Sequence, residues 1–436
     1  MQDMRHLFLQ FRGKNEPVKA DARQVKTWMD DHPSGLDPEV IAIREMNKER
    51  ILRIIIRMIS EKKIRSASFN FGDDVDDAAK YNQALVWWND KNFHLRFAVR
   101  SPELLNEMLD YSLDDTTMER LYRAEKMGIP FFVNPYYLSL LNTALPGFSV
   151  GADLAIRDYV IYSGELLDEF GEISAWEKED VVEPGKPNEA GWLLPNESNI
   201  HRRYPEVSIL IPDTMGRACG GLCSSCQRMY DFQSGHLNFD LDKLKPRQTW
   251  KEKLVELMEY FENDSQLRDI LITGGDALMS SDFSVKQILD AVYDMAVRKA
   301  EANKSRPEGE KYAEMLRVRL GTRLPVYLPQ RITPELAAIL KDFREKAIKT
   351  GFKQFVIQTH FESAMEVTPA VKEAVKRLLD AGWIITNQLV FTAAASRRGH
   401  TAKLRRVLND IGVLTYYTFT VKGFMENRHN FATNAR

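Results

Sequence analysis

Apolar positions divide the chain into two parts with different periodicity. In the first part, apolar residues recur three and four positions apart within highly charged sequence, as expected for helices with one buried face. The clearest such face comprises Ile51, Leu52, Ile55, Met58 and Ile59. This spacing predicts a mostly helical N-terminal region.

In the second part, short apolar runs alternate with segments of helical periodicity. Thr333-Pro334 and Thr368-Pro369 each combine an N-cap residue with proline at the first helical position, which predicts two helix starts. The runs that have the length and composition of buried strands are 207–211, 269–273, 317–320, 352–359, 384–391 and 414–421. Six strand–helix units in series predict an α/β fold with a parallel sheet or an open barrel.

A polar, acidic segment rich in proline and glycine, residues 164–199, separates the two parts. We therefore predict two regions. Residues 1–199 form a mostly helical N-terminal region with this linker at its end, and residues 200–436 form a partial (β/α)6 barrel.

Composition narrows the class of protein. A net charge of -2 over 436 residues gives no general attraction to nucleic acid or to an anionic membrane. The first ten residues lack the pattern of a signal peptide, and the apolar run 51–59 is too short to span a bilayer. The 3 cysteines are clustered, unlike a secreted disulfide framework, so we expect a soluble protein of the reducing cytoplasm.

The cysteine cluster is the strongest chemical signal. Cys219, Cys223 and Cys226 are spaced C-x3-C-x2-C in one short loop, and thiolates are soft metal ligands. Iron–sulfur clusters are normally held by four cysteines, so three would leave one iron open to another ligand. The alternatives are unrelated buried thiols or a structural zinc site completed by a distant histidine such as His201 or His236.

Other polar residues follow the predicted strands. In parallel α/β folds the chemistry lies at the carboxyl ends of the strands, where the cysteine loop, Gly274-Gly275-Asp276, Thr359-His360 and Lys422 all fall. The glycines would admit a ligand close to the backbone, and the carboxylate could meet an ammonium group. Taken singly, the glycines are common in ordinary turns, His360 is more often a core histidine, and Lys422 is more often a solvated residue at a strand end.

Two arginines lie beside the strand that carries the cysteine loop. Arg203, followed by Tyr204, precedes that strand and could bind an anion, although a loop arginine is more often solvated. Arg228 follows the last cysteine by two residues, and it either points beside the metal centre or lies on the surface.

From about Pro135 onward the chain resembles the lysine 2,3-aminomutase family of radical S-adenosylmethionine (SAM) enzymes. The resemblance is carried by several motifs in the same order. They are Pro135-Tyr-Tyr-Leu-Ser-Leu, His201-Arg-Arg-Tyr-Pro-Glu, the C-x3-C-x2-C loop, Leu271-Ile-Thr-Gly-Gly-Asp-Ala-Leu, Arg323-Leu-Pro-Val-Tyr-Leu-Pro-Gln-Arg-Ile-Thr-Pro-Glu-Leu, Thr359-His-Phe, Asn387-Gln and Thr415-Tyr-Tyr.

The resemblance implies a radical SAM barrel and a set of cofactors. Cys219, Cys223 and Cys226 would hold a [4Fe-4S] cluster whose open iron chelates SAM, and cleavage of SAM would give a 5′-deoxyadenosyl radical. Family members also bind pyridoxal phosphate (PLP). The implied SAM contacts are Gly274, Gly275, Asp276, Gln330, His360 and Gln388; Arg203 and Tyr204 would grip the PLP phosphate, and Arg228 the substrate α-carboxylate.

Three departures from the family pattern bear on the substrate and cofactors. Lys422 stands where the lysine-acting enzymes have an aspartate. Glutamate 2,3-aminomutases resemble this chain in having a lysine at that place. A cation there favours a substrate whose side chain carries a carboxylate. The family's second phosphate-binding arginine would fall near Val207 and is absent from this chain. The residues between the cysteines also differ from those of the family pattern.

The sequence ends at Arg436, before the glycine-rich segment that carries the family's PLP-anchoring lysine. We therefore expect either a fragment truncated at its C-terminus or a member that anchors PLP differently or not at all.

The resulting prediction is a PLP-dependent radical SAM 2,3-aminomutase that prefers glutamate to lysine. The alternatives are a radical SAM enzyme without PLP or with another substrate, and a non-enzymatic iron–sulfur or zinc module. The expected partners are a small amino acid, an electron donor such as flavodoxin or ferredoxin, and a second copy of the chain in a homo-oligomer.

Overall fold

A computed structural model describes residues 2–14, 21–64, 66–129, 131–142, 153–165, 167–168, 193–196, 199–214, 218–221, 223 and 249–419. Within them, one eight-stranded sheet has the order β1-β2-β3-β4-β5-β6-β7-β8. Its strands are β1 (Leu193–Asn196), β2 (Ile200–Tyr204), β3 (Val207–Leu210), β4 (Asp269–Ile272), β5 (Arg317–Gly321), β6 (Gln354–Thr359), β7 (Ile384–Val390) and β8 (Leu414–Phe419).

The sheet combines two kinds of strand pairing. The pairs β1–β2 and β2–β3 are antiparallel, whereas every neighbouring pair from β3 to β8 is parallel. The six parallel strands coincide with the six predicted runs, and the α/β class with a parallel sheet is confirmed. β1 pairs with β2 although it precedes residue 200, so the sheet begins before the predicted boundary at 199/200.

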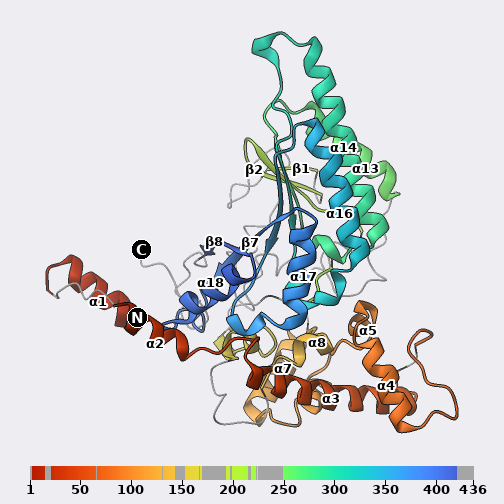
Figure 1. Cartoon of the computed structure of the whole chain (residues 1–436), viewed down its shortest axis with the longest axis vertical. Coiled ribbons are helices and arrows are strands. Elements are labelled where there is room, and N and C mark those ends of the chain that lie inside the picture. Colours follow the sequence, from red (N-terminus) through yellow and green to blue (C-terminus); the bar gives the residue numbers. More distant parts are fainter. Residues whose placement is uncertain are drawn as a thin grey trace.

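Helices connect successive parallel strands and cover one face of the sheet. In Figure 1 four of them lie side by side along that face. They are α13 (Trp250–Asn263), α14 (Asp282–Ser305), α16 (Pro334–Ala347) and α17 (Pro369–Asp380), and α18 (His400–Asp410) leads into β8. The shorter elements are α15 (Leu324–Tyr327), η2 (Ala277–Met279), η3 (Glu308–Glu310), η4 (Pro329–Arg331), η5 (Ile348–Thr350) and η6 (Ala364–Glu366).

Local sequence explains where these helices begin and end. The Thr333 side chain accepts a hydrogen bond from the backbone N–H of Leu336, and Thr368 does the same for Val371, as the two Thr-Pro pairs predicted. Gly382, at φ +80°, follows α17 and adopts the left-handed conformation that glycine favours at a helix end.

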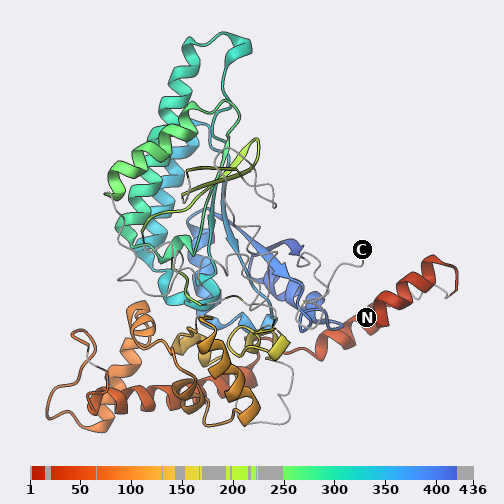
Figure 2. The same cartoon turned by 180° about the vertical axis from the view of Figure 1, so that it is seen from behind.

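The described residues before β1 are largely helical. These helices are α1 (Gln2–Phe11), α2 (Ala22–Asp30), α3 (Pro38–Ser60), α4 (Asp77–Trp87), α5 (Lys91–Arg96), α6 (Pro102–Met108), α7 (Asp115–Lys126), α8 (Pro135–Leu138) and α9 (Leu154–Arg157). Most of them gather at one end of the sheet, below it in Figure 1 and again in the reverse view of Figure 2.

Contacts of α8 identify that end as the carboxyl end of the parallel strands. Asn134 Nδ2 donates to the carbonyl oxygen of Tyr327 at 2.8 Å, and the Tyr136 hydroxyl lies 2.7 Å from Thr368 Oγ1. Tyr327 follows β5 and Thr368 follows β6, so the N-terminal helices cover the edge where polar residues were predicted. None of the described helices is long and apolar enough to cross a membrane.

Candidate active site

A cavity of about 630 Å³ lies at the carboxyl end of the parallel strands. Its wall is formed by Tyr204 of β2, by the cysteine loop, and by residues that lie within β4, β5, β6, β7 and β8 or directly after β4, β5 and β6. Segments more than 200 residues apart in sequence therefore meet around one space. This convergence is the arrangement that the strand-end residues predicted.

Two cysteines of the motif, Cys219 and Cys223, belong to the wall of this cavity. The glycines between them are closely packed: a Cβ on Gly220 would lie 2.6 Å from Leu324 Cδ2, and one on Gly221 would lie 2.8 Å from the Tyr327 ring. Larger residues at these two positions would push the loop away from α15. The glycines therefore bring the cysteines against the end of β5.

The environment of Cys223 favours its thiolate form. Arg323 Nη1 donates a hydrogen bond to Cys223 Sγ at 3.3 Å. Burial raises the pKa of the Cys223 thiol, but the charge of Arg323 and hydrogen bonds from His360 and Arg323 outweigh it, so the pKa falls below its usual value. The thiolate is the form that binds metal.

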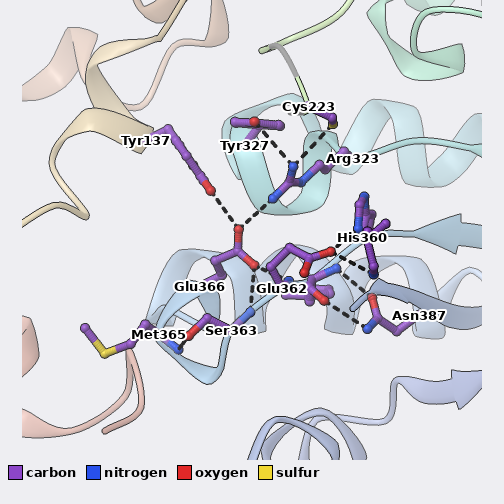
Figure 3. Close-up of polar contacts among 12 residues, drawn as sticks. Tyr137, Cys223, Arg323, Tyr327, His360, Glu362, Ser363, Met365, Glu366 and Asn387 are labelled. Carbon is purple, nitrogen blue, oxygen red and sulfur yellow. Dashed lines mark hydrogen bonds and ion pairs between the residues drawn. The ribbon is translucent and has the colours of Figure 1, made fainter. Parts of the chain in front are cut away.

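Arg323 is held by groups on several sides (Figure 3). Its Nη2 donates to Glu366 Oε1 at 2.8 Å, and Glu366 also accepts a 2.8 Å hydrogen bond from the Tyr137 hydroxyl. The guanidinium lies over the rings of Tyr159 and Tyr327, with Cζ 3.8 and 4.4 Å from the ring centroids. The Arg323 and Glu366 side chains are 7% and 0% exposed, so this is a buried, paired charge.

His360 sits on the same wall, at the end of β6. Its Nε2 pairs with Glu362 Oε1. Burial lowers the pKa of His360, but the charge of Glu362 and hydrogen bonds with Cys223 and Glu362 raise it to about 9. Asn387 fixes the intervening Phe361 by accepting from its N–H at 2.6 Å and donating to its carbonyl oxygen at 3.1 Å.

The Gly274-Gly275-Asp276 turn joins the cysteine loop to the end of β5. Gly274 has φ +140°, and a Cβ there would lie 2.5 Å from Ile211 Cγ2, so only glycine fits. The Asp276 N–H donates to the carbonyl oxygen of Ala218 at 2.9 Å. Its carboxylate accepts from the N–H groups of Leu278 at 3.0 Å and Arg323 at 2.7 Å, and burial raises its pKa to about 6.

Several known proteins are similar to this chain in sequence. The chain is 30% identical over 419 residues, 94% of its length, to an uncharacterized KamA family protein of Methanocaldococcus jannaschii, covering 56% of that protein. It is 26% identical over 339 residues to the L-lysine 2,3-aminomutase of Methanococcus maripaludis, covering 78% of this chain and 65% of the relative. It is 27% identical over 352 residues to the glutamate 2,3-aminomutase of Clostridioides difficile, covering 78% of this chain and 67% of the relative.

The chain is therefore similar to proteins of the lysine 2,3-aminomutase (KamA) family. It spans between about half and two thirds of the length of these relatives. No family model matches the chain.

Several residues assigned from the family resemblance meet in the cavity wall. They are Cys219, Cys223, Gly275, Asp276, His360, Gln388 and Tyr204. Gly274 directly precedes Gly275 in the chain. The wall does not include Gln330, whose Oε1 is buried without a hydrogen-bond partner among the described residues. It does not include Arg203 either, whose Cζ lies 5.8 Å from the centroid of the Tyr204 ring.

Cys226, Arg228 and Lys422 lie outside the described residues. Among the residues that are described, no group of three or more histidine, cysteine, aspartate or glutamate side chains is placed to hold a metal ion. A metal centre held by Cys219 and Cys223 would need further ligands beyond the described residues. A pair of soft sulfur ligands in one wall, one of them favoured as thiolate, fits an iron–sulfur cluster of this family.

Sequence reasoning gave no role to two arginines of the wall, Arg319 and Arg323. Arg319 occupies an inward position of β5, where it donates from Nε to Asp269 Oδ1 at 2.9 Å. Two arginines that alternate with apolar residues in β5, Arg317 and Arg319, were a usable signal. Arg323, two residues past the end of β5, obeys the same strand-end rule that singled out His360.

The charged residues of the wall are mostly cationic. Among the lining residues that the structure describes, Arg319, Arg323 and His360 are cationic groups and Asp276 is the single carboxylate. The carboxylates that pair with these cations are absent from the wall; they are Asp269, Glu366 and Glu362. Each of these cations is thus balanced by a carboxylate behind the wall, and the cationic groups are the ones presented to a ligand in the cavity.

Proposed function

We propose that this chain is a radical SAM 2,3-aminomutase, with β3 to β8 as its partial barrel and Cys219, Cys223 and Cys226 as the ligands of a [4Fe-4S] cluster. One observation carries the proposal. Two motif cysteines, the Gly275-Asp276 turn, His360 and Gln388 come from separate segments and line one cavity at the carboxyl end of the sheet. The homology to named 2,3-aminomutases supports the same reading.

The described residues would hold and shield the cofactors. The cluster and SAM supply the radical chemistry when they are bound. His360, which lines the cavity and pairs with Glu362, offers an imidazole to an anionic group. Gln388 offers an amide, and the N-terminal helices cover the strand ends and keep water from them.

Glutamate is the proposed substrate. The mostly cationic wall of the cavity suits a substrate with two carboxylates better than one with a second ammonium group. Arg228 is the proposed partner of the α-carboxylate, and Lys422 of the side-chain carboxylate. One relative of similar identity is named glutamate 2,3-aminomutase.

PLP is part of the proposal, with Arg203 and Tyr204 as partners of its phosphate. Tyr204 supports this assignment because it contributes to the cavity wall. A flavodoxin or ferredoxin is the proposed electron donor, and the proposed assembly is a homo-oligomer.

Anaerobic reconstitution with iron and sulfide, followed by incubation with SAM, PLP and dithionite, tests the function. Glutamate and lysine are supplied separately, and the products are identified by chromatography and mass spectrometry. We expect β-glutamate from glutamate and no β-lysine. A variant in which all three cysteines are replaced by serine is the control and should form neither product.

Each alternative has its own outcome in this experiment. Turnover of lysine but not of glutamate would refute the charge argument. A SAM-dependent cluster in protein that shows no PLP imine absorbance would favour a radical SAM enzyme without PLP. An electron paramagnetic resonance (EPR) signal unchanged by SAM would favour a non-enzymatic iron–sulfur module.

A further inference from the structure

We propose that Arg323 raises the reduction potential of the cluster on the cysteine motif, and that Glu366 and Tyr137 hold its guanidinium against Cys223. This inference rests on the proposed function, because it requires a cluster bound to Cys223. It assigns a positioning role to residues that neither the cysteine motif nor the predicted SAM contacts include.

The guanidinium of Arg323 contacts the sulfur of Cys223 directly. Arg323 Nη1 lies 3.3 Å from Cys223 Sγ, within the range of an N–H···S hydrogen bond. Hydrogen bonds to the sulfurs and nearby charge are two of the ways in which a protein adjusts the potential of an iron–sulfur cluster. Reduction adds one electron, taken from an external low-potential donor, and so adds one negative charge to the cluster. A fixed cation and an N–H donor stabilise that added charge.

Burial makes this charge effective. The Arg323 side chain is 7% exposed, and two tyrosine rings lie within 3.8 and 4.4 Å of its Cζ, so little water screens it. An arginine buried in this way needs a partner, which Glu366 supplies at 2.8 Å. Glu366 is fixed in turn by the Tyr137 hydroxyl and by the N–H groups of Glu362 at 2.6 Å and Ser363 at 3.2 Å.

The chain of contacts crosses from one part of the fold to the other. Tyr137 belongs to α8 among the N-terminal helices, Glu366 follows β6, and Arg323 follows β5 (Figure 3). The N-terminal helices therefore do more than cover the strand ends. Through Tyr137 and the ring of Tyr159 they fix the orientation of the guanidinium that meets the cluster ligand.

Two substitutions should shift the potential in opposite directions. Arg323→Gln removes the positive charge and should make the midpoint potential more negative. Glu366→Gln removes the negative charge beyond Arg323 while keeping an oxygen acceptor, and should make it less negative. Arg323→Lys keeps the charge but reaches one partner at a time, so it should shift the potential in the same direction as Arg323→Gln and by less.

The experiment is an EPR-monitored redox titration of the reconstituted full chain with dithionite as reductant, without substrate. For Arg323→Gln we expect at least about a tenfold change in the ratio of oxidised to reduced cluster at fixed potential, or about 59 mV for one electron. A control variant should match the wild type. Arg298→Gln removes a guanidinium on α14 that is half exposed and does not line the cavity.

The outcomes separate this inference from the proposed function. If the wild-type chain assembles no cluster, both fail. If the cluster assembles and neither Arg323 variant differs from the wild type, only the inference fails. Shifts of the same sign in Arg323→Gln and Glu366→Gln would indicate a general structural disturbance and would also overturn it. Should Arg323→Gln not fold, the shift of Arg323→Lys decides.

Discussion

The two sides of the cavity are built in different ways. On one side, which we call the anchored side, Asp276, Arg323 and His360 follow β4, β5 and β6, and each has a hydrogen-bond or ion-pair partner. On the other, the open side, β8 (Leu414–Phe419) contributes Tyr417 and Phe419 to the wall. These two side chains are 50% and 42% exposed.

The difference shows which part of the cavity is preorganised. Charged groups with fixed partners keep one orientation whether or not a ligand is present, so the anchored side can hold a charged cofactor at little cost in conformational entropy. Exposed aromatic rings offer apolar area without fixed direction. The anchored side should therefore be sensitive to single atoms, and the open side should tolerate change.

The largest expected effect is loss of the metal centre. Cys223→Ser removes a thiolate from the anchored side and should abolish retention of iron and of the visible absorbance after reconstitution. Tyr417→Phe, on the open side, should retain both. Iron content and absorbance spectra of the two variants, prepared together, test this contrast. Equal loss of iron in both would show that the open side is as critical as the anchored one.

Removing Glu366 should have the next largest effect. Glu366→Ala leaves the Arg323 guanidinium buried without its carboxylate, which typically costs about 3–5 kcal/mol in the free energy of unfolding. Urea unfolding followed by circular dichroism measures the loss. The control is Asp380→Ala, which breaks the exposed pair with Lys376 on α17 and should leave the unfolding curve unchanged. A small loss for Glu366→Ala would mean that water reaches Arg323.

The strands and helix caps were predictable because their signals are local. A short apolar run such as Asp269–Ile272 and a Thr-Pro pair before a helix act within a few residues, and the structure contains both as expected. The helix after β4 was harder to delimit. α14 continues to Ser305 through mostly polar residues, in which no apolar periodicity marks the helix.

The candidate site was only half predictable for the same reason. The strand-end rule brought Cys223, Asp276 and His360 to one place, because it follows from topology alone. The pairing of Arg323 with Glu366 spans 43 residues, and that of Tyr137 with Glu366 spans 229. No local pattern specifies which buried carboxylate meets which arginine, since tertiary packing decides it.

A pH effect is expected near the open side, on the helix that leads into β8. His400 of α18 is buried, and its ring lies 5.3 Å from that of His32, centroid to centroid. Burial, and next the charges of His32 and Arg397, lower the pKa of His400 to about 4. In the unfolded chain the pKa returns to about 6.5, so acid protonates the unfolded state first and stability falls as the pH drops from about 6.5 towards 4.

Between pH 7 and pH 5 this single group should remove about 2 kcal/mol from the free energy of unfolding. Urea unfolding at the two pH values, for the wild type and for His400→Asn, isolates its share. His94 is also buried, with its pKa lowered to about 3, and it titrates equally in both proteins. The same pH dependence in both proteins would show that α18 stays packed around a charged imidazole.

The smallest expected effect is a difference in unfolding free energy between two Tyr→Phe variants, one on the anchored side and one on the open side. Tyr136→Phe removes the hydrogen bond to Thr368 Oγ1 beneath the N-terminal helices, yet Thr368 Oγ1 still accepts from the Val371 N–H at 3.1 Å. Because no polar atom is left unpaired, the loss should be about 1 kcal/mol, the net value of one neutral hydrogen bond.

Tyr416→Phe alters a side chain of β8 that is 55% exposed and should change stability by less than about 0.5 kcal/mol. The two unfolding midpoints, measured under one condition, order the two sides directly. A larger loss for Tyr416→Phe would mean that β8 is fixed by its hydroxyls, and the distinction between the anchored and open sides would no longer hold.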